Sequence, residues 1–336
     1  MSAGDPSAVG WLARLRAGEL SARELTARTL DRIDAADATV HAVVSQDRRT
    51  ALEAADAADA ARRAGDRRPL LGLPITVKDC LDVRGLPTLS GTLARRGHVA
   101  DGDATVVARL RAAGAIPVAK TNVPELCSSF ETDNVVHGRT DHPLDPARTP
   151  GGSSGGEAAL LGADASIVGV GTDGGGSIRV PAHYVGVVGL RPTVGRTPET
   201  GAWPDTRAAG TADLTCLGPM ARHVEDLALL LPIMSGADGI DPFAVDVALG
   251  DPDAVGLRGL RVGILIDHPD APPVTPGVRA AVDAAARTLE GLGATVETLD
   301  VRTLVGDGPT ATELFFAAAG ADGGAGMRAA TAGADG

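Results

Sequence analysis

Aromatic side chains are scarce in this chain: Phe, Trp and Tyr together make up 2% of its 336 residues. Apolar residues still account for 44%, so the core must be built mainly from Ala, Val, Leu and Ile. No run of 18 apolar residues occurs, so we expect no membrane-spanning segment. An excess of positive charge is also missing. The formal net charge is -12, which argues against a surface for nucleic acid or anionic membrane.

Cysteine is equally rare. Cys80, Cys127 and Cys216 are odd in number and widely spaced, with no C-x-x-C pair, and therefore give no zinc signature. The first fifteen residues contain no basic segment followed by an apolar one, so we expect no secretory signal. These absences together predict a cytoplasmic protein that works in a reducing environment.

Lysine is nearly absent, since Lys78 and Lys120 stand against 29 arginines. A chain of this composition uses Arg wherever only a positive charge is needed, so a surviving lysine indicates a chemical reason. Lys78 lies in "LPITVKDC", within a predicted buried strand. A buried lysine can lose its proton and act as a base. The alternative is a surface lysine that lays its stem along apolar neighbours.

Strands alternate with helices along most of the chain, which predicts an α/β fold with a sheet covered by helices on both faces. Residues 5–66 are expected to be helical, with Ser21 and Glu24 forming a capping box. We expect one domain over 1–336, with N-terminal helices at 1–66, a core at 67–315 and a weakly structured end at 316–336. Strands are predicted at 73–83, 116–120, 166–173, 260–265 and 294–300, and further helices at 103–115, 156–163, 222–236 and 274–293.

Two glycine-rich clusters lie close together in "RTPGGSSGGEAALLGADASIVGVGTDGGGSIRV", residues 148–180. In the second cluster, three glycines run directly into Ser177. Glycine lets consecutive backbone N–H groups turn inward, and such a nest binds developing negative charge. A serine at its end is where a nucleophile would sit. Asp173 and Arg179 could brace this turn by an ion pair, while the hydroxyls of Ser153 and Ser154 could pass a proton.

Three other interpretations of these segments have weaker support. "GVGTDG", residues 169–174, matches a dinucleotide-binding fingerprint, but the next apolar run follows too soon for a crossover helix. "GSSGG", residues 152–156, matches a nucleophile elbow centred on Ser154, but a proline-rich loop precedes it instead of a strand. A metal cluster would need His137, His142, Asp133 and Cys127, whose spacing fits no usual zinc signature.

The long segment from Gly151 to Gly195, "GGSSGGEAALLGADASIVGVGTDGGGSIRVPAHYVGVVGLRPTVG", closely resembles the signature of the amidase signature family of serine hydrolases. "GLPITVKD", "VAKTNVPEL", "NVVHGRTDHPLDPARTPGG" and "LTCLGPMARHVEDLALLL" resemble the family as well. The resemblance covers roughly residues 10 to 320. It implies a mixed β-sheet core with helices on both faces.

The resemblance also implies roles for individual residues. The family's Ser–cis-Ser–Lys triad falls on Ser177 as nucleophile, Ser153 as proton bridge and Lys78 as base, and the bond before Ser153 is expected to be cis. Neither a metal nor a cofactor is implied. The remaining matches are the oxyanion hole at Gly174, Gly175, Gly176 and the Ser177 amide, the supporting residues Ser154, Thr172, Asp173 and Arg179, and Cys127 lining the acyl pocket.

The implied activity is hydrolysis of a linear carboxamide, a small-molecule substrate, to an acid and ammonia or an amine. One alternative is the glutaminase component of a tRNA-dependent amidotransferase, which would need partner subunits. Glu157, where glutaminase subunits more often carry Ser, favours the free amidase. Because family members are usually longer, we expect the later part of the domain to be missing, and an inactive remnant is the second alternative. A homodimer is left open.

Overall fold

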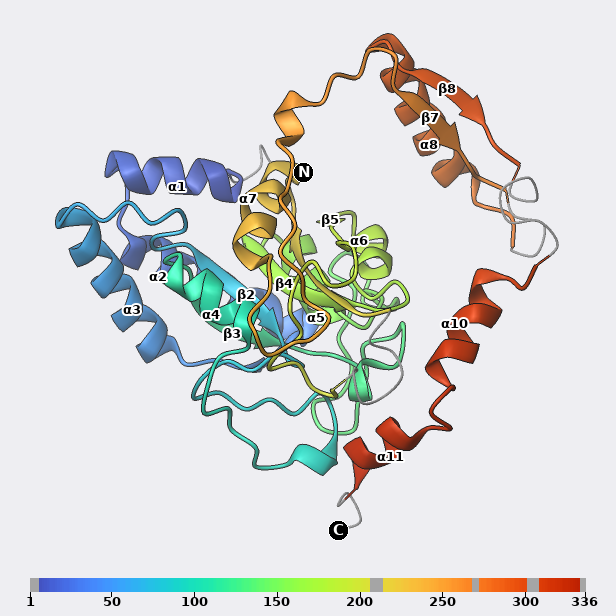
Figure 1. The fold of residues 1–336 in the computed structure, drawn as a ribbon. Coiled ribbons are helices and arrows are strands. Elements are labelled where there is room, and N and C mark those ends of the chain that lie inside the picture. Colours follow the sequence, from blue (N-terminus) through green and yellow to red (C-terminus); the bar gives the residue numbers. More distant parts are fainter. Residues whose placement is uncertain (1–5, 206–213, 268–271, 301–307, 333–336) are drawn as a thin grey trace. The chain divides into compact units, whose positions relative to one another are not determined.

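The computed structural model describes residues 6–205, 214–267, 272–300 and 308–332 (Figure 1). The chain divides into two compact units, residues 1–247 with 318–336, and residues 248–317. Residues 1–5 begin the predicted N-terminal helical segment, and residues 333–336 end the segment predicted to be weakly structured. Both lie outside the described residues. Among the residues described, no helix combines the length and apolar character needed to cross a bilayer.

A mixed six-stranded sheet forms the centre of the first unit, as predicted. Strand β2 runs parallel to both β3 and β4, whereas β1 pairs antiparallel with β3, and β6 pairs antiparallel with both β4 and β5. The spatial order is β1-β3-β2-β4-β6-β5. The strands are β1 (Val43–Ser45), β2 (Pro74–Lys78), β3 (Ile116–Thr121), β4 (Val168–Asp173), β5 (Val188–Gly189) and β6 (Cys216–Ala221).

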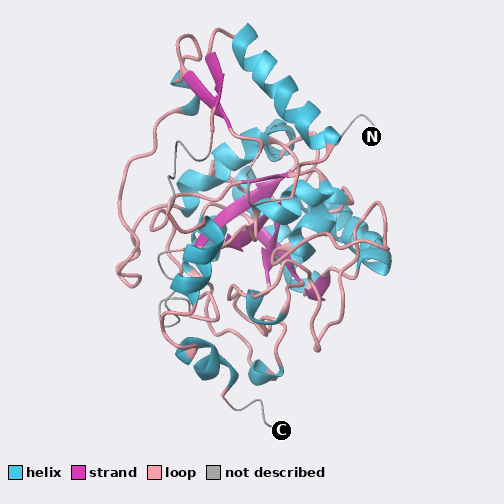
Figure 2. Ribbon diagram, turned by 90° about the vertical axis from the view of Figure 1, so that its right-hand side faces the viewer, coloured by secondary structure: helices cyan, strands magenta, loops and turns pink. Residues whose placement is uncertain are grey.

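Helices lie on both sides of this sheet (Figures 1 and 2), as predicted. One group packs around α7 and contains α1 and α4, while in the other group α2 and α6 pack on α5, and α3 packs on α2. The helices are α1 (Ala8–Ala17), α2 (Ala22–Val40), α3 (Arg48–Arg63), α4 (Thr105–Ala112), α5 (Gly155–Gly162), α6 (Arg179–Val185) and α7 (Val224–Met234), with short 3-10 turns at η1 (Leu93–Arg95) and η2 (Glu125–Cys127). A third 3-10 turn, η3 (Pro252–Ala254), belongs to the second unit.

The two faces of β2 differ in chemistry, and this difference places the site. Ile75 and Val77 point into the aliphatic core, whereas Thr76 and Lys78 point to the opposite face, towards α5. All four side chains are buried. The core is built largely from Ala, Val, Leu and Ile, as the scarcity of aromatic residues predicts.

The second unit is small and little buried. Strands β7 (Arg261–Ile264) and β8 (Thr295–Thr298) pair in parallel, with α8 (Pro276–Gly291) between them in the chain. None of these three elements contains a fully buried residue. Helix α10 (Ala311–Ala319) follows in the chain. Helix α11 (Ala325–Thr331) belongs to the first unit and lies within 316–336, the segment predicted to be weakly structured. Its alanines favour the helix.

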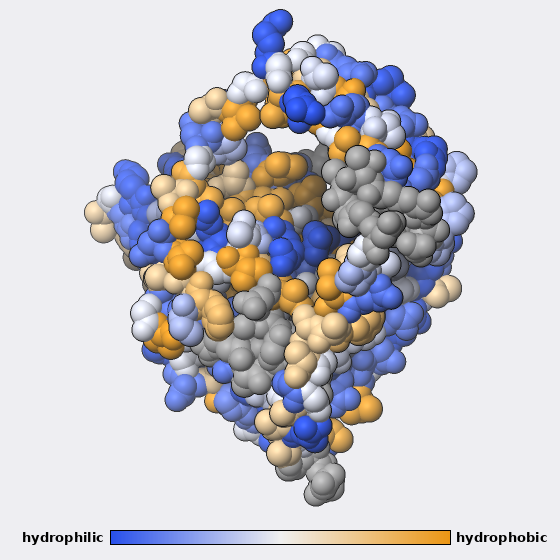
Figure 3. All heavy atoms as spheres, turned by 45° about the vertical axis from the view of Figure 1, so that its right-hand side comes forward, coloured by the Kyte–Doolittle hydropathy of each residue, from blue (hydrophilic) through white to orange (hydrophobic). Residues whose placement is uncertain are grey.

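Surface apolar residues are interspersed with hydrophilic ones on the face that Figure 3 presents. Some exposed large apolar side chains stand alone in the sequence, for example Val135 and Leu144, whereas Ile240, Phe243, Val245, Val247 and Leu249 follow one another closely. Scattered exposure of this kind is normal for a folded protein.

Candidate active site

Strand β2 ends at Lys78, whose side chain is completely buried. Its Nζ atom lies 2.6 Å from Ser153 Oγ, 2.7 Å from Thr172 Oγ1 and 3.5 Å from the Thr172 carbonyl oxygen. No carboxylate among the described residues forms an ion pair with it. Its polar neighbours are therefore neutral oxygens, and two of these are hydroxyls that can donate a hydrogen bond to an uncharged amine.

Lys120, the other lysine, lies in a different environment on the neighbouring strand β3. It is also completely buried, but its Nζ atom lies 3.0 Å from Asp79 Oδ1 in an ion pair. It donates further hydrogen bonds to the Pro87 carbonyl and to Thr88 Oγ1, both at 2.6 Å. Burial lowers the pKa of Lys120, and the charge of Asp79 opposes that shift. The partners of Lys120 suit a charged ammonium, whereas those of Lys78 suit a neutral amine.

Ser153 reaches Lys78 from the turn that precedes α5. The Gly152–Ser153 peptide bond is cis, which confirms the expectation for this position. A side chain on Gly152 would come within 2.8 Å of the Ser129 carbonyl oxygen, so only glycine fits here. Ser154 is the N-cap residue of α5, and its Oγ donates to the Thr172 carbonyl at 3.3 Å.

The second glycine cluster is organised by Asp173, which is fully buried at the end of β4. Its carboxylate accepts backbone N–H bonds from Gly176 at 2.8 Å and Ile178 at 3.1 Å. Arg179 forms the predicted ion pair with it, with 2.9 Å between Nη2 and Oδ1. Burial raises the pKa of Asp173, but hydrogen bonds from Arg179 and Ile178 outweigh burial and hold that pKa below its usual range. The turn is thus braced by an ionised carboxylate.

Ser177 lies at the end of this turn and is 9% exposed. Its carbonyl oxygen accepts the Ser154 N–H at 3.0 Å, so the two glycine clusters are joined through their backbones. Within the described residues, the Ser153 and Ser177 hydroxyls make no hydrogen bond to each other. Hydrogen bonds of this kind often tighten only when substrate binds.

Gly176 has a φ of +133°, in the region that favours glycine, and a side chain there would meet Val180 Cγ2 at 2.9 Å. Its N–H already donates to Asp173. The role of the Gly176 amide in an oxyanion hole therefore stays a prediction. Gly174, Gly175 and Ser177 are the neighbouring amides that could serve beside it.

Cys127 lies on the 3-10 turn η2, with a φ of +56° and its Sγ atom 3.7 Å from Ser90 Oγ. A hydrogen bond from Cys80 lowers the pKa of the Cys127 thiol below its usual range. Cys80 Sγ in turn lies 3.8 Å from Thr172 Oγ1, the hydroxyl that contacts Lys78. Cys127 is thus linked to the lysine through two intervening residues, Cys80 and Thr172.

The weaker interpretations of the sequence do not fit the structure. Residues 169–173, most of the dinucleotide-like motif, lie inside strand β4 and not on a loop that leads into a helix. Ser154 follows a loop and is turned towards a carbonyl oxygen. The described residues contain no group of three or more His, Cys, Asp and Glu side chains that could hold a metal. His142 instead lies 3.1 Å from the Tyr184 carbonyl oxygen.

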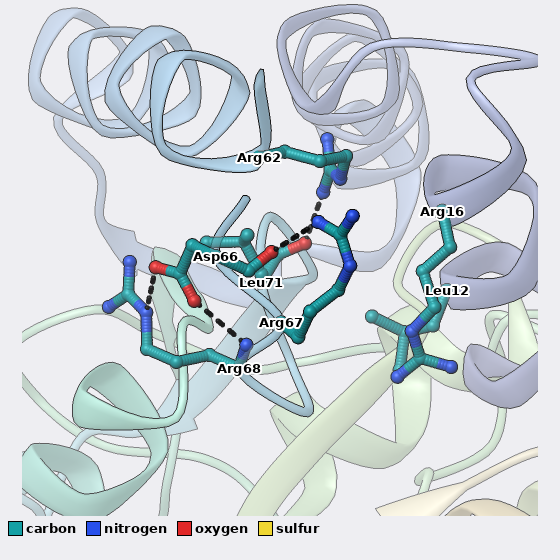
Figure 4. Close-up of a pocket in the computed structure, with 7 residues that line it drawn as sticks. All are labelled: Leu12, Arg16, Arg62, Asp66, Arg67, Arg68 and Leu71. Carbon is teal, nitrogen blue, oxygen red and sulfur yellow. Dashed lines mark hydrogen bonds and ion pairs between the residues drawn. The ribbon is translucent and has the colours of Figure 1, made fainter. Parts of the chain in front are cut away.

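A pocket on another part of the first unit is shown in Figure 4. Its arginines belong to the last turns of α1 and α3 and to the loop after α3. Each already has a partner within the chain: Arg16 donates to the Pro69 carbonyl, Arg62 to the Leu71 carbonyl and Arg67 to the Asp66 carbonyl, while Arg68 pairs with the Asp66 carboxylate. The pocket lies near the start of β2, whereas Lys78 ends that strand. The lining residues are Leu12, Arg16, Arg62, Asp66, Arg67, Arg68 and Leu71.

Sequence reasoning missed a buried polar cluster beside the site. Glu157 is fully buried and accepts hydrogen bonds from Thr76 Oγ1 at 2.6 Å and Thr121 Oγ1 at 2.8 Å. Asp79, the partner of Lys120, was missed as well. Their side-chain partners lie 36 to 81 residues away in the chain, so no local pattern reveals them. The sign available in the sequence was that Glu157 and Asp79 are each a charged residue among mostly apolar or small residues.

The comparisons with known proteins identify the family of the chain. A family model described as Amidase matches residues 24–328, and the chain belongs to this family. Over 291 residues it is 38% identical to the A subunit of Glutamyl-tRNA(Gln) amidotransferase from Desulfatibacillum aliphaticivorans, covering 86% of this chain and 59% of that protein.

Two solved structures are also similar. Fatty acid amide hydrolase superposes with a TM-score of 0.87 at 26% identity, covering 98% of this chain and 58% of that one. A bacterial aryl acylamidase of the amidase signature family gives 0.85 at 30% identity, covering 96% and 66%. The chain thus spans less than two thirds of the length of each of these three proteins.

Proposed function

We propose that this chain carries an amide-hydrolysing centre in which Ser177 is the nucleophile, Ser153 the proton bridge and Lys78 the base. The observation that carries the proposal is the 2.6 Å contact between Lys78 and Ser153 in a buried site where no described carboxylate pairs with the lysine. A neutral lysine can accept a proton, whereas one held in an ion pair cannot.

The proposed reaction moves one proton along this line. Ser177 Oγ attacks the amide carbonyl carbon while its proton passes to Ser153, whose own proton passes to Lys78. The resulting oxyanion is stabilised by backbone N–H groups of the glycine turn. When the C–N bond breaks, the leaving ammonia or amine takes a proton back through Ser153. Water then hydrolyses the acyl-enzyme by the same route.

We propose glutamine as the amide, with the chain acting as the glutaminase component of a cytoplasmic tRNA-dependent amidotransferase. The support is the 38% identity to an amidotransferase component, which extends over 86% of this chain. Such a role requires companion subunits, which would use the released ammonia. It also requires groups that bind the charged amino acid end of glutamine.

A free amidase acting on linear carboxamides is the second candidate. The similarity to an aryl acylamidase, with a TM-score of 0.85, favours it. Glu157 favours it too, since glutaminase subunits more often carry Ser at that position. Both candidates use the same three residues and differ in substrate and partners.

Ammonia release separates the two candidates. The chain would be incubated with glutamine, alone and with the companion subunits of an amidotransferase, and in parallel with simple aliphatic and aryl amides. A glutaminase predicts ammonia from glutamine that rises when the partners are added. A free amidase predicts turnover of simple amides without them. Ser177→Ala is the control, and an inactive remnant would match that control on every substrate.

A further inference from the structure

Glu157 occupies a site built to receive its carboxyl group. It lies in the first turn of α5, four residues after Ser153, and all of its surface is buried. Its Oε1 accepts from Thr121 on β3 and its Oε2 from Thr76 on β2. A side chain at Gly169 on β4 would come within 1.8 Å of Oε2. Three strands therefore make room for one carboxyl group.

We propose that Glu157 is a positioning residue of the active site, which holds α5 and Ser153 against Lys78 and does so as a neutral acid, so that Lys78 can lose its proton. This inference rests on the proposed function of Lys78 as the base. It assigns Glu157 no contact with substrate.

The hydrogen bonds around Glu157 can be satisfied in the neutral state. A protonated Oε2 would donate to Thr76 Oγ1. That hydroxyl has a second acceptor, the Val168 carbonyl oxygen at 3.3 Å, to which it can then donate. Thr121 continues to donate to Oε1. When Glu157 carries its proton, every buried polar side-chain atom of the cluster still has a hydrogen-bond partner. Buried polar groups in folded proteins meet this requirement.

Burial also favours the neutral acid. It raises the pKa of Glu157 to about 8, although hydrogen bonds from Thr76 and Thr121 oppose the shift. Lys78 on β2 faces this carboxyl, and a positive charge on Lys78 would lower the pKa of Glu157. Lys120 on β3 is paired with Asp79, and Asp173 on β4 is paired with Arg179. Glu157 and Lys78 thus form a coupled unit, in which a negative Glu157 would hold the proton on Lys78.

The position of Glu157 couples it to Ser153 through one turn of helix. The hydrogen bonds to β2 and β3 fix the start of α5 above the sheet. Gly156 lets the helix come close, because a side chain there would approach within 2.5 Å of the Asn122 nitrogen. Loss of these bonds would loosen the residue that bridges Lys78 and Ser177.

The test compares the pH dependence of turnover in three variants and the parent. Glu157→Gln keeps the shape and is neutral at every pH. Its kcat should therefore follow that of the parent up to about pH 8, and the two profiles should separate only above that pH, where Glu157 of the parent ionises. Glu157→Asp keeps the charge with a shorter reach, so kcat should fall across the whole pH range. Asp226→Asn is the matched control. Asp226 is a buried carboxyl whose pKa is also raised by burial, but it contacts the start of α1 instead of the site.

A second readout does not depend on activity. The folded state holds Glu157 neutral up to about pH 8, whereas the unfolded chain ionises it near its ordinary value of 4.5. Parent stability against urea should therefore fall between pH 5 and pH 8 more steeply than that of Glu157→Gln.

Equal pH dependence of the urea midpoint in parent and Glu157→Gln would overturn the neutral acid. With an active parent, a rising limb that Glu157→Gln moves to lower pH below about pH 8 would likewise overturn the neutral acid. Profiles that still superimpose above pH 8, where Glu157 of the parent is ionised, would overturn its action on Lys78. If the parent hydrolyses no amide and Ser177 takes no label, the proposed function fails, and with it the role assigned to Glu157. The urea readout would then still report the charge state.

Discussion

At the scale of single residues, the two lysines show how the same side chain serves two purposes. Both are completely buried on adjacent strands. Lys120 meets a carboxylate and remains a structural cation, whereas Lys78 meets hydroxyls and a carbonyl oxygen. The rarity of lysine in the sequence points to both positions, but only the identity of the partners separates them.

Replacing each lysine by methionine should give opposite results. Lys78→Met should reduce turnover by at least about a hundredfold, because a general base is lost, with little change in the free energy of unfolding. Lys120→Met leaves Asp79 buried and unpaired, so it should cost about 3–5 kcal/mol of stability. Urea unfolding and turnover of a simple amide, measured on both variants, check this.

The double variant Asp79→Asn/Lys120→Met is the control for the second effect, since it removes both charges. It should recover part of the lost stability. Equal stability losses in the two lysine variants would contradict the distinction between base and structural cation.

At the scale of elements, the sequence predicts most helices and strands but misplaces several ends. Helix α2 begins at the predicted capping box, with Ser21 and Glu24 bonded reciprocally, and runs to Val40. Strand β1 (Val43–Ser45) then interrupts the segment 5–66, which is predicted to be helical. Strand β2 ends at Lys78, although the predicted strand runs on to Val83. The reason is tertiary, because Asp79 turns to accept the N–H groups of Leu89 and Ser90.

More of the candidate site than of the residues around it could be predicted from the sequence. Glycine runs and serines lie in one continuous stretch, and a family resemblance extends over it. The Glu157 cluster could not be predicted, because it joins α5 to two strands through threonines that are ordinary residues for a strand. Glu157 and its two threonine partners come together only once the sheet has formed.

The capping box gives a prediction at this scale. Ser21→Ala removes the side chain that accepts the Glu24 N–H at 3.0 Å, and this should lower the free energy of unfolding by about 1 kcal/mol. Turnover should not change, because α2 contributes no residue to the site. Urea unfolding measures the first effect, and a loss of turnover in a fully folded variant would contradict the second.

At the scale of the whole molecule, the two units differ in how much they bury. The first contains the mixed sheet, whose strands β2, β4 and β6 are buried throughout. In the second, β7, β8 and α8 have no fully buried residue. Protection from local unfolding follows buried contacts.

Hydrogen–deuterium exchange should therefore be slowest in β2, β4 and β6 and clearly faster in β7, β8 and α8. Peptides from β1, a short and half-buried edge strand, give an internal comparison. Uniform protection across both units would contradict this expectation, because it would mean that something other than buried residues stabilises the second unit.

The most direct test of the central claim is the site and rate of labelling by a fluorophosphonate, which reacts only with an activated serine. The parent should carry one adduct, mapped by mass spectrometry to Ser177. Lys78→Arg should label at least about a hundredfold more slowly, because guanidinium does not release its proton in proteins. An adduct on Ser153 or Ser154, or equal labelling of Lys78→Arg and the parent, would contradict the proposed centre.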